Sequence, residues 1–397
     1  EWNGTSLVDI SDPSSPELVW HIPNDGNANS RSVSVVYDYG FDSAPPGRDF
    51  LIRNSEVGED LKFQIFDITA RDTNPSRISL VAEINSTPEN SCGPGCGGVL
   101  RHRAHKGHWS PETGLYYSAS GEPGFRSALI HIWNLRDPRN PQFVGRAWLP
   151  GQKEGEEGFE GQYVHHPVVD EANDRVYAGF RIGSGHIASW DISDPSDPRL
   201  VWSYDTSPPG RGPHTVSPIV YDEVPNITAA DGELPRTYAL VSDEYDGLEC
   251  PHGIKSRVYM FDITHETHPM PLSTWQVPIG DFCDIGGNFG PHQHAETVNG
   301  YLNRFEDKLA WIAYLNAGVR VLDISDPQNL REVGYYIPKT NASPRPSQPR
   351  PVPIQLTDVD IDHRGLVYAS DRSGESCMGQ GEGCVGTGLF VLEYTGN

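Results

Sequence analysis

The chain has 397 residues, and its 54 acidic side chains outnumber 30 Lys and Arg, which gives a formal net charge of −24. So negative a surface repels phosphate groups and argues against nucleic acid or an anionic membrane as a partner. No apolar run approaches the ~20 residues that a membrane span needs, and the 41 Gly and 34 Pro argue against long helices.

A repeated motif predicts the fold. An alternating apolar strand runs into D-I-S-D-P, where Asp and Ser side chains cap a turn and Pro ends the strand; a second strand follows. The motif begins as SLVDISDPSSPELVW at Ser6 and returns along the whole chain at a mean spacing of about 64 residues. Its aligned positions are Asp9, Asp67, Asn134, Asp191, Asp262, Asp323 and Glu393.

A second pair of strands precedes most copies, as in HWSPETGLYYSAS and HPVVDEANDRVYAGF, and reads as a hairpin. Four strands per repeat, seven times over, predict an all-β fold: one seven-bladed β-propeller with four-stranded blades that spans residues 1–397 as a single domain. Only eight residues precede Asp9, so we expect the first blade to be incomplete at the N-terminus and its missing strands to come from upstream residues. Separate β domains in series would need linkers that the sequence does not show.

The D-I-S-D-P core resembles that of the LVIVD-repeat family of exported bacterial β-propeller proteins. The similarity is strongest from Tyr163 to Gly396, through YVHHPVV, GPHTVSPIV, GPHQHAE and YLNAGVRVLDISDP. The resemblance implies a propeller over nearly the whole chain. It implies no reaction, because most of the family has none assigned and a fold alone does not supply one.

Six cysteines lie at positions 92, 96, 250, 283, 377 and 384. The sequence has no CxxC knuckle, and the Gly-rich loops SCGPGC and SCMGQGEGC favour disulfides over a thiolate metal site. Six cysteines allow 15 pairings; 92–96 and 377–384, leaving 250–283, is the simplest. Disulfides predict a secreted protein, extracellular or periplasmic. Four N-x-S/T sequons are compatible with a glycoprotein: Asn3, Asn85, Asn226 and Asn341.

Histidines give the sharpest functional signal. In four consecutive blades a histidine stands at or just before the innermost strand, in RAHKGHW, YVHHPVV, GPHTVSP and GPHQHAE. Innermost strands line a propeller's axis, so four imidazoles there would form a metal site. The predicted ligands are His105, His165, His214 and His292, with His108, His166 and His294 as their neighbours. The alternative is that these rings hydrogen-bond the backbone or belong to Gly-Pro-His turns.

Other metallo-propellers offer an analogy for this arrangement. Carotenoid-cleavage oxygenases hold iron by four axial histidines, and the selenium-binding/methanethiol-oxidase group has histidine-rich channels. The full motifs of both groups are absent here. Four imidazoles suit iron or copper, with zinc or manganese as the alternatives.

Carboxylates near these strands could orient the imidazoles or act as acid and base. Glu296 follows HQHA, and Asp243 and Glu244 lie in ALVSDEYDG, while Glu157 and Glu160 are weaker candidates. From this set we predict Glu296 and Asp243, together with His294, as catalytic residues.

The combined prediction is a secreted metalloprotein, a metal-dependent oxidoreductase that acts on a small organic substrate. One alternative is a metal-dependent polysaccharide lyase with a glycan substrate. Another is a non-enzymatic extracellular protein for binding, adhesion or assembly, because the chain has no GxSxG elbow, P-loop or HExxH motif. The sequence leaves the oligomeric state open.

Overall fold

A computed structural model describes residues 4–24, 30–41, 44–55, 61–85, 104–181, 185–207, 212–228, 233–244, 256–296, 308–339, 354–371 and 388–396. Clustering of contacts divides the chain into two compact units. Unit 1 comprises Glu1–Gly183 and Ala188–Ser203, and unit 2 comprises Ser184–Ile187 and Tyr204–Asn397. Within the described ranges, no helix is long and apolar enough to cross a membrane.

Unit 1 is built from antiparallel sheets whose strands follow one another in sequence. A two-stranded sheet comes first, made of β1 (Gly4–Asp9) and β2 (Glu17–Pro23). Three four-stranded sheets follow: β3 (Ser30–Phe41), β4 (Ala44–Ser55), β5 (Leu61–Asp67) and β6 (Ser79–Asn85); β7 (Ala104–Trp109), β8 (Leu115–Ser120), β9 (Leu129–Asn134) and β10 (Gln142–Ala147); and β11 (Tyr163–Asp170), β12 (Arg175–Arg181), β13 (His186–Asp191) and β14 (Arg199–Asp205). Two 3₁₀ turns, Pro75–Arg77 and Glu171–Asn173, lie in the connections.

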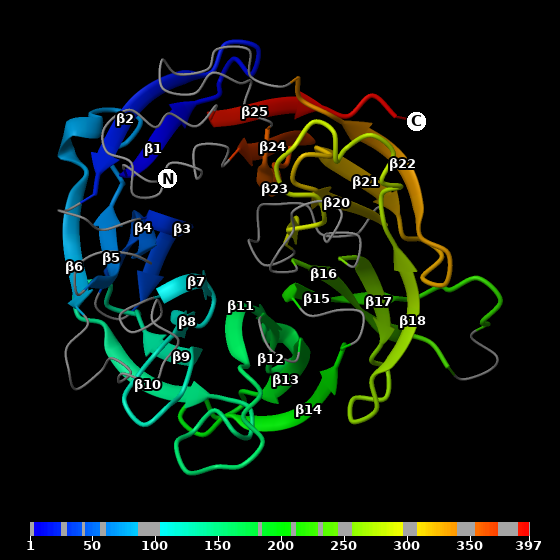
Figure 1. Ribbon diagram of the computed structural model, residues 1–397. Helices are drawn as coiled ribbons and strands as arrows, with labels where there is room; N and C mark the ends of the chain where they lie inside the picture. Colours follow the sequence, from blue (N-terminus) through cyan, green and yellow to red (C-terminus); the bar gives the residue numbers. More distant parts are fainter. Residues whose placement is uncertain are drawn as a thin grey trace. The chain divides into compact units, whose positions relative to one another are not determined.

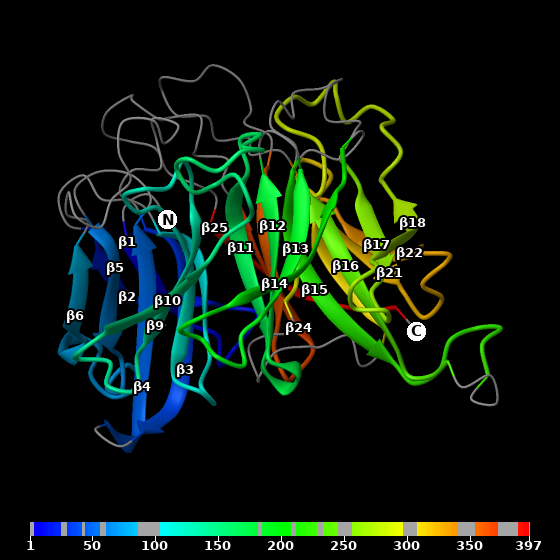
Figure 2. The same cartoon turned by 90° about the horizontal axis from the view of Figure 1, so that it is seen from below.

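Unit 2 continues the same pattern with three sheets. These are β15 (Pro213–Tyr221), β16 (Arg236–Asp243), β17 (Val258–Asp262) and β18 (Met270–Trp275); β19 (Gln293–His294), β20 (Leu309–Ala313), β21 (Val319–Asp323) and β22 (Arg331–Tyr336); and the three-stranded β23 (Leu356–Ile361), β24 (Leu366–Asp371) and β25 (Gly388–Glu393). Within each unit the first strands of successive four-stranded sheets, such as β3, β7 and β11, lie side by side, and the fourth strands form the outer rim (Figure 1). Figure 2 shows the strands of unit 1 from the side, standing upright next to one another.

The repeated turn has a common hydrogen bond. The motif aspartate accepts the amide of the residue two positions later, as in Asp191 with Ser193 at 2.9 Å and Asp323 with Ser325 at 2.9 Å. An Asx turn of this kind reverses the chain locally, so each third strand is followed at once by its outer partner. This contact explains why the motif recurs once per sheet.

Apolar residues fill the spaces between successive sheets of a unit. In unit 1, Ile132 of β9 belongs to the same cluster as Phe180 of β12, and both are fully buried. In unit 2, Met260 of β17 shares a cluster with Ile312 of β20. Burying such a side chain contributes about 1.5–3 kcal/mol, so contact between neighbouring sheets is the main source of stability.

The expected number of blades was wrong. Among the described residues, six sheets have three or four strands and form blades, and the seventh, β1–β2, has only two strands. The first repeat core supplies the motif strand and its outer partner, which pair from Gly4 opposite Pro23 to Asp9 opposite Glu17, without an inner hairpin. Counting motif strands therefore gives seven, whereas the described residues form six blades.

Candidate metal centre

The innermost strands of the blades carry a bulge close to their first residue. In β11 the register shifts between Val164 and His166, so His165 is the extra residue. In β15 it shifts between Pro213 and Thr215, which makes His214 the extra residue. A bulge leaves one residue without a cross-strand partner and changes the direction of its side chain. The bulges therefore give these two imidazoles directions that differ from those of side chains in a regular strand.

The other two predicted histidines occupy corresponding positions. The register of β7 shifts between Ala104 and Gly107, which places His105 in the bulge. The His292 amide donates to the Ala313 carbonyl over 2.9 Å, and Gln293 is paired with the same residue, so two residues face one. In β23, the next inner strand, the bulge residue is Thr357.

In unit 1 the structure brings His105 and His165 together. Their ring centroids lie 4.0 Å apart at an interplanar angle of 66°. His165 is buried, with 1% of its surface exposed, and His105 is partly buried. A contact this close between imidazoles on neighbouring inner strands allows both rings to reach a common ligand from one unit.

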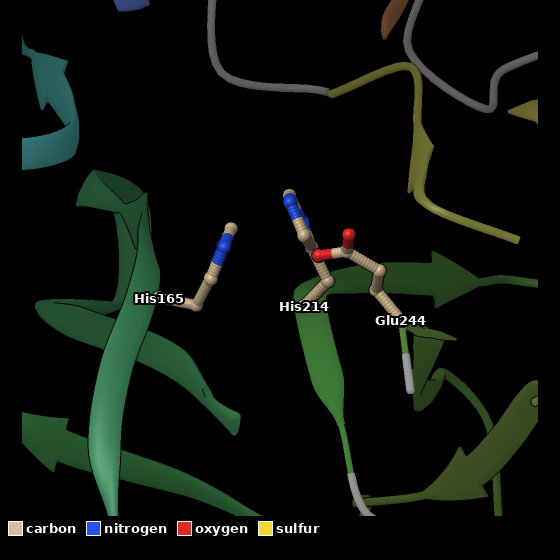
Figure 3. Close-up of side chains that lie close together, drawn as sticks. All are labelled: His165, His214 and Glu244. Atoms are coloured by element: carbon tan, nitrogen blue, oxygen red, sulfur yellow. The ribbon is translucent and has the colours of Figure 1, made fainter. Parts of the chain in front are cut away.

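Unit 2 holds the second pair together with a carboxylate. The ring centroids of His214 and His292 lie 4.3 Å apart, and His292 Nε2 lies 3.5 Å from Glu244 Oε1. One ligand atom of His214 lies within 4.8 Å of one of Glu244. Figure 3 shows Glu244 just beyond the end of β16 with its carboxylate directed toward His214 of β15; the picture also labels His165 on β11 of unit 1.

Hydrogen bonds orient both imidazoles of unit 2. The Nδ1–H of His292 donates to the Thr357 carbonyl, and His214 Nδ1 lies 2.7 Å from the Thr215 hydroxyl. Metal-binding histidines commonly donate one ring N–H to a carbonyl or hydroxyl, which leaves the lone pair on the other nitrogen. In a neutral His292 the lone pair is therefore on Nε2, the atom next to Glu244. This set of donors fits a transition-metal ion.

The three predicted catalytic residues form hydrogen bonds with residues in or beside the strands that carry the histidines. Asp243 Oδ1 accepts the Gly212 amide over 2.6 Å, which fixes the start of β15. His294 is buried between two serine hydroxyls, with Nδ1 2.7 Å from Ser242 and Nε2 2.8 Å from Ser217. Glu296 accepts a hydrogen bond from Gln293, the residue after His292.

Glu244 was a candidate carboxylate in the sequence, but Asp243 beside it was the residue predicted for the site. It lies directly after Asp243 in two consecutive acidic positions, and the structure buries both completely. The carboxylate that meets the histidines is that of Glu244, whereas Asp243 binds the backbone. Two adjacent acids at the end of a strand were the available signal, but they did not reveal which one faces the imidazoles.

The two neighbouring histidines have enclosed environments. His108 is 3% exposed, and burial lowers its pKa to about 4, so this ring is neutral at pH 7. His166 is fully buried next to the bulge of β11. Both lie in the strand interiors instead of at the bulges.

Most of the cysteines and two of the sequons lie outside the described residues. Cys283 is described and is disulfide-bonded. Its partner, Cys250 in the prediction, and the four cysteines of the short loops are not among those residues, so the pairing stays a prediction. Asn85 ends β6, and Asn226 has a left-handed backbone with φ of 67°.

Comparison with known sequences identifies the repeat. The family model of the LVIVD repeat matches residues 1–22, 190–206 and 306–337, which contain the motif aspartates Asp9, Asp191 and Asp323. The chain therefore carries LVIVD repeats, and the resemblance seen in its motifs is confirmed. None of the curated proteins matches the sequence.

Solved structures support the propeller fold. A hypothetical selenium-binding protein from Sulfolobus tokodaii is similar with a TM-score of 0.59 and 13% identity, over 93% of this chain and 79% of that one. A periplasmic gluconolactonase from Pseudomonas aeruginosa is similar with a TM-score of 0.51 and 14% identity, over 95% of this chain and 92% of that one. A putative 6-phosphogluconolactonase from Bacteroides fragilis has a TM-score of 0.50 and 12% identity, over 96% of this chain and 87% of that one. At such identities the similarity concerns the fold.

Proposed function

We propose that this LVIVD-repeat propeller is a metal-dependent oxidoreductase that acts on a small organic substrate, with one transition-metal ion bound by His105, His165, His214 and His292. The observation that carries the proposal is the bulge histidine on four consecutive inner strands, which occurs as one close pair in each unit. A propeller arranges its inner strands around one axis. The proposal therefore assigns both pairs to one centre and both units to a single propeller domain.

Iron or copper in these imidazoles would supply one-electron chemistry, whereas zinc would favour hydrolysis or a lyase reaction. The protein's own contribution is to fix the ligands and exclude water. His165 and His214 are each only 1% exposed, and the contact of His292 with the Thr357 carbonyl places a proton on its Nδ1. Asp243, Glu296 and His294 have positioning roles in this proposal, since their contacts hold the strands that carry the ligands.

We also propose that the protein is located outside the cytosol. Cys283 is disulfide-bonded, and disulfides persist in oxidising compartments. One solved protein of similar fold is a periplasmic gluconolactonase, and another is described as selenium-binding. We therefore propose a periplasmic or extracellular enzyme with a small-molecule substrate.

Metal analysis of the purified full-length chain tests the proposal. We expect about one transition-metal ion per chain, and we expect H105A and H214A each to lose most of it because the remaining ligands bind more weakly. His268 lies exposed in the turn between β17 and β18, so H268A is the matched control and should retain the ion. Full metal content in both H105A and H214A, with an intact fold by circular dichroism, would contradict the proposal.

A further inference from the structure

We infer that Glu244 is itself a ligand of the ion, so that unit 2 alone presents a set of two histidines and one carboxylate. This inference rests on the proposed metal site and deepens it. The ligand atoms are His214 Nε2, His292 Nε2 and a carboxylate oxygen of Glu244. The set favours ferrous iron or another divalent ion of similar preference over cuprous copper.

The distances between the side chains suit coordination of one ion. Two ligand atoms that each lie about 2.1 Å from one ion are separated by about 3.0–3.4 Å in octahedral or tetrahedral sites. The observed separation of His292 Nε2 and Glu244 Oε1 is 3.5 Å. His214 lies within 4.8 Å of the same carboxylate and has its ring 4.3 Å from that of His292. Binding of one ion by all three groups requires rotations of these side chains.

The charge distribution of His292 and Glu244 also favours a bound cation. Because Nδ1 of His292 donates a hydrogen bond to the Thr357 carbonyl, a neutral ring has its lone pair on Nε2, which lies 3.5 Å from Glu244 Oε1. A lone pair and an anion repel each other, and both groups are buried, where this repulsion is weakly screened. A positive charge between them removes the repulsion. A metal ion supplies that charge, and a proton on His292 Nε2 or on Glu244 is the competing explanation.

Backbone hydrogen bonds also hold Glu244 in place. The Glu244 amide donates to the Gly212 carbonyl over 2.6 Å, while the Gly212 amide donates to Asp243 over 2.6 Å. This pair of bonds ties the end of β16 to the residue two positions before His214. Glu244 and His214 are thus fixed to each other through a short backbone connection, as a preorganised ligand pair requires.

The ligand types then restrict the metal. A carboxylate oxygen is a hard ligand, whereas cuprous copper prefers thiolates and thioethers. Two histidines and one carboxylate with open positions are typical of non-haem ferrous sites. The carboxylate would also offset one of the two charges of a divalent ion inside the buried site.

The test measures the affinity of the full-length protein for Fe(II) and for Cu(I), each added alone under anaerobic conditions, by competition with a chelator. The variants are E244Q, which keeps the shape and removes the charge, and E266Q, a matched loss of charge in an exposed turn of unit 2. We expect E244Q to weaken Fe(II) binding at least about tenfold and to change Cu(I) binding by less than about threefold. E266Q should bind both ions as the wild type does.

Each outcome separates this inference from the proposed function. If H214A loses Fe(II) while E244Q binds it as tightly as the wild type, the histidine site stands and Glu244 is no ligand. Glu244 is likewise excluded as a selective ligand if E244Q weakens Cu(I) binding as much as Fe(II) binding. If neither Fe(II) nor Cu(I) binds to the wild type, the proposed function fails, and the contact between His292 and Glu244 is an ordinary ion pair of a protonated imidazole.

Discussion

His214 and Thr215 are adjacent in β15, and their side chains are hydrogen-bonded, with Nδ1 of the imidazole 2.7 Å from the Thr215 hydroxyl oxygen. The bulge at His214 allows this contact, because it turns the histidine side chain away from the direction that it would have in a regular strand. His292 obtains the equivalent contact from a backbone carbonyl, that of Thr357. The orientation of the His214 imidazole thus depends on a neighbouring side chain, whereas that of His292 depends on the backbone.

This difference gives the first prediction. T215V keeps the shape of the side chain but removes the hydroxyl, so it should lower metal affinity by about 10–100-fold, as is typical for partners of metal-binding imidazoles. T215S retains the hydroxyl and should bind nearly as the wild type does. T357V retains the carbonyl and should also be neutral. Metal affinity measured by chelator competition checks all three, and equal affinity in T215V and T215S would contradict the assigned role.

The second prediction concerns the repeated turn. Burial by itself would raise the pKa of Asp262, but hydrogen bonds from Arg236 and Thr264 and the charge of Arg236 lower it below its ordinary value. D262A removes both hydrogen bonds, leaves Arg236 without its buried partner, and should cost about 2–3 kcal/mol of unfolding free energy at pH 7. The contribution is present above about pH 4 and is lost as the pH falls further, because the unfolded carboxyl then binds a proton more readily.

Chemical denaturation of D262A and D9A compares a buried with an exposed copy of the same turn. Asp9 accepts the Ser11 amide over 2.8 Å but lies at the surface, so D9A should lose less stability. An equal loss in the two variants would show that the local turn, and not the buried pair with Arg236, determines the effect.

The repeat could be read from the sequence because its signal is local. An Asx turn needs only the aspartate and the residues that follow, so every copy of the motif marks the end of a third strand. The number of blades could not be obtained in this way, because the motif marks only a third strand and its outer partner and gives no information on the inner hairpin. The count of seven failed for that reason.

The candidate site was only partly predictable, also for a physical reason. Histidines before the inner strands are visible in GPHTVSP and GPHQHAE, but a bulge is defined by the partner strand and has no sequence signature of its own. The choice between Asp243 and Glu244 likewise depends on the path of the chain after β16. Asp243 turns to the Gly212 amide, which leaves the next residue to approach the imidazoles.

The third prediction concerns the cysteines. If the pairs are 92–96, 250–283 and 377–384, thiol titration of the denatured, unreduced protein should find almost no free thiol. Cys283 is disulfide-bonded, in agreement with this expectation. Peptide mapping of the unreduced protein should recover Cys283 linked to Cys250. A different partner would refute the pairing, and six reactive thiols would also remove the main support for an oxidising compartment.

The last prediction concerns acid sensitivity and follows from His108. Burial lowers the pKa of this ring to about 4, from an ordinary value of 6.5. Between these two values the unfolded chain binds a proton that the folded chain does not, so stability falls as the pH decreases from 6.5 to 4. For this single group the loss between pH 7 and pH 5 is about 2 kcal/mol.

A matched pair of variants isolates this contribution. H108Q replaces the ring by an uncharged amide, so its unfolding free energy should decrease between pH 7 and pH 5 by about 2 kcal/mol less than that of the wild type. His131 is also buried with its pKa lowered to about 4, but Glu122 lies 3.2 Å from it and opposes the effect of burial, so it is the less suitable probe. H268Q, at an exposed position, should show the same pH dependence as the wild type. Urea denaturation at both pH values decides the question, because an identical loss in H108Q and the wild type would mean that the folded chain protonates His108 as readily as the unfolded chain does.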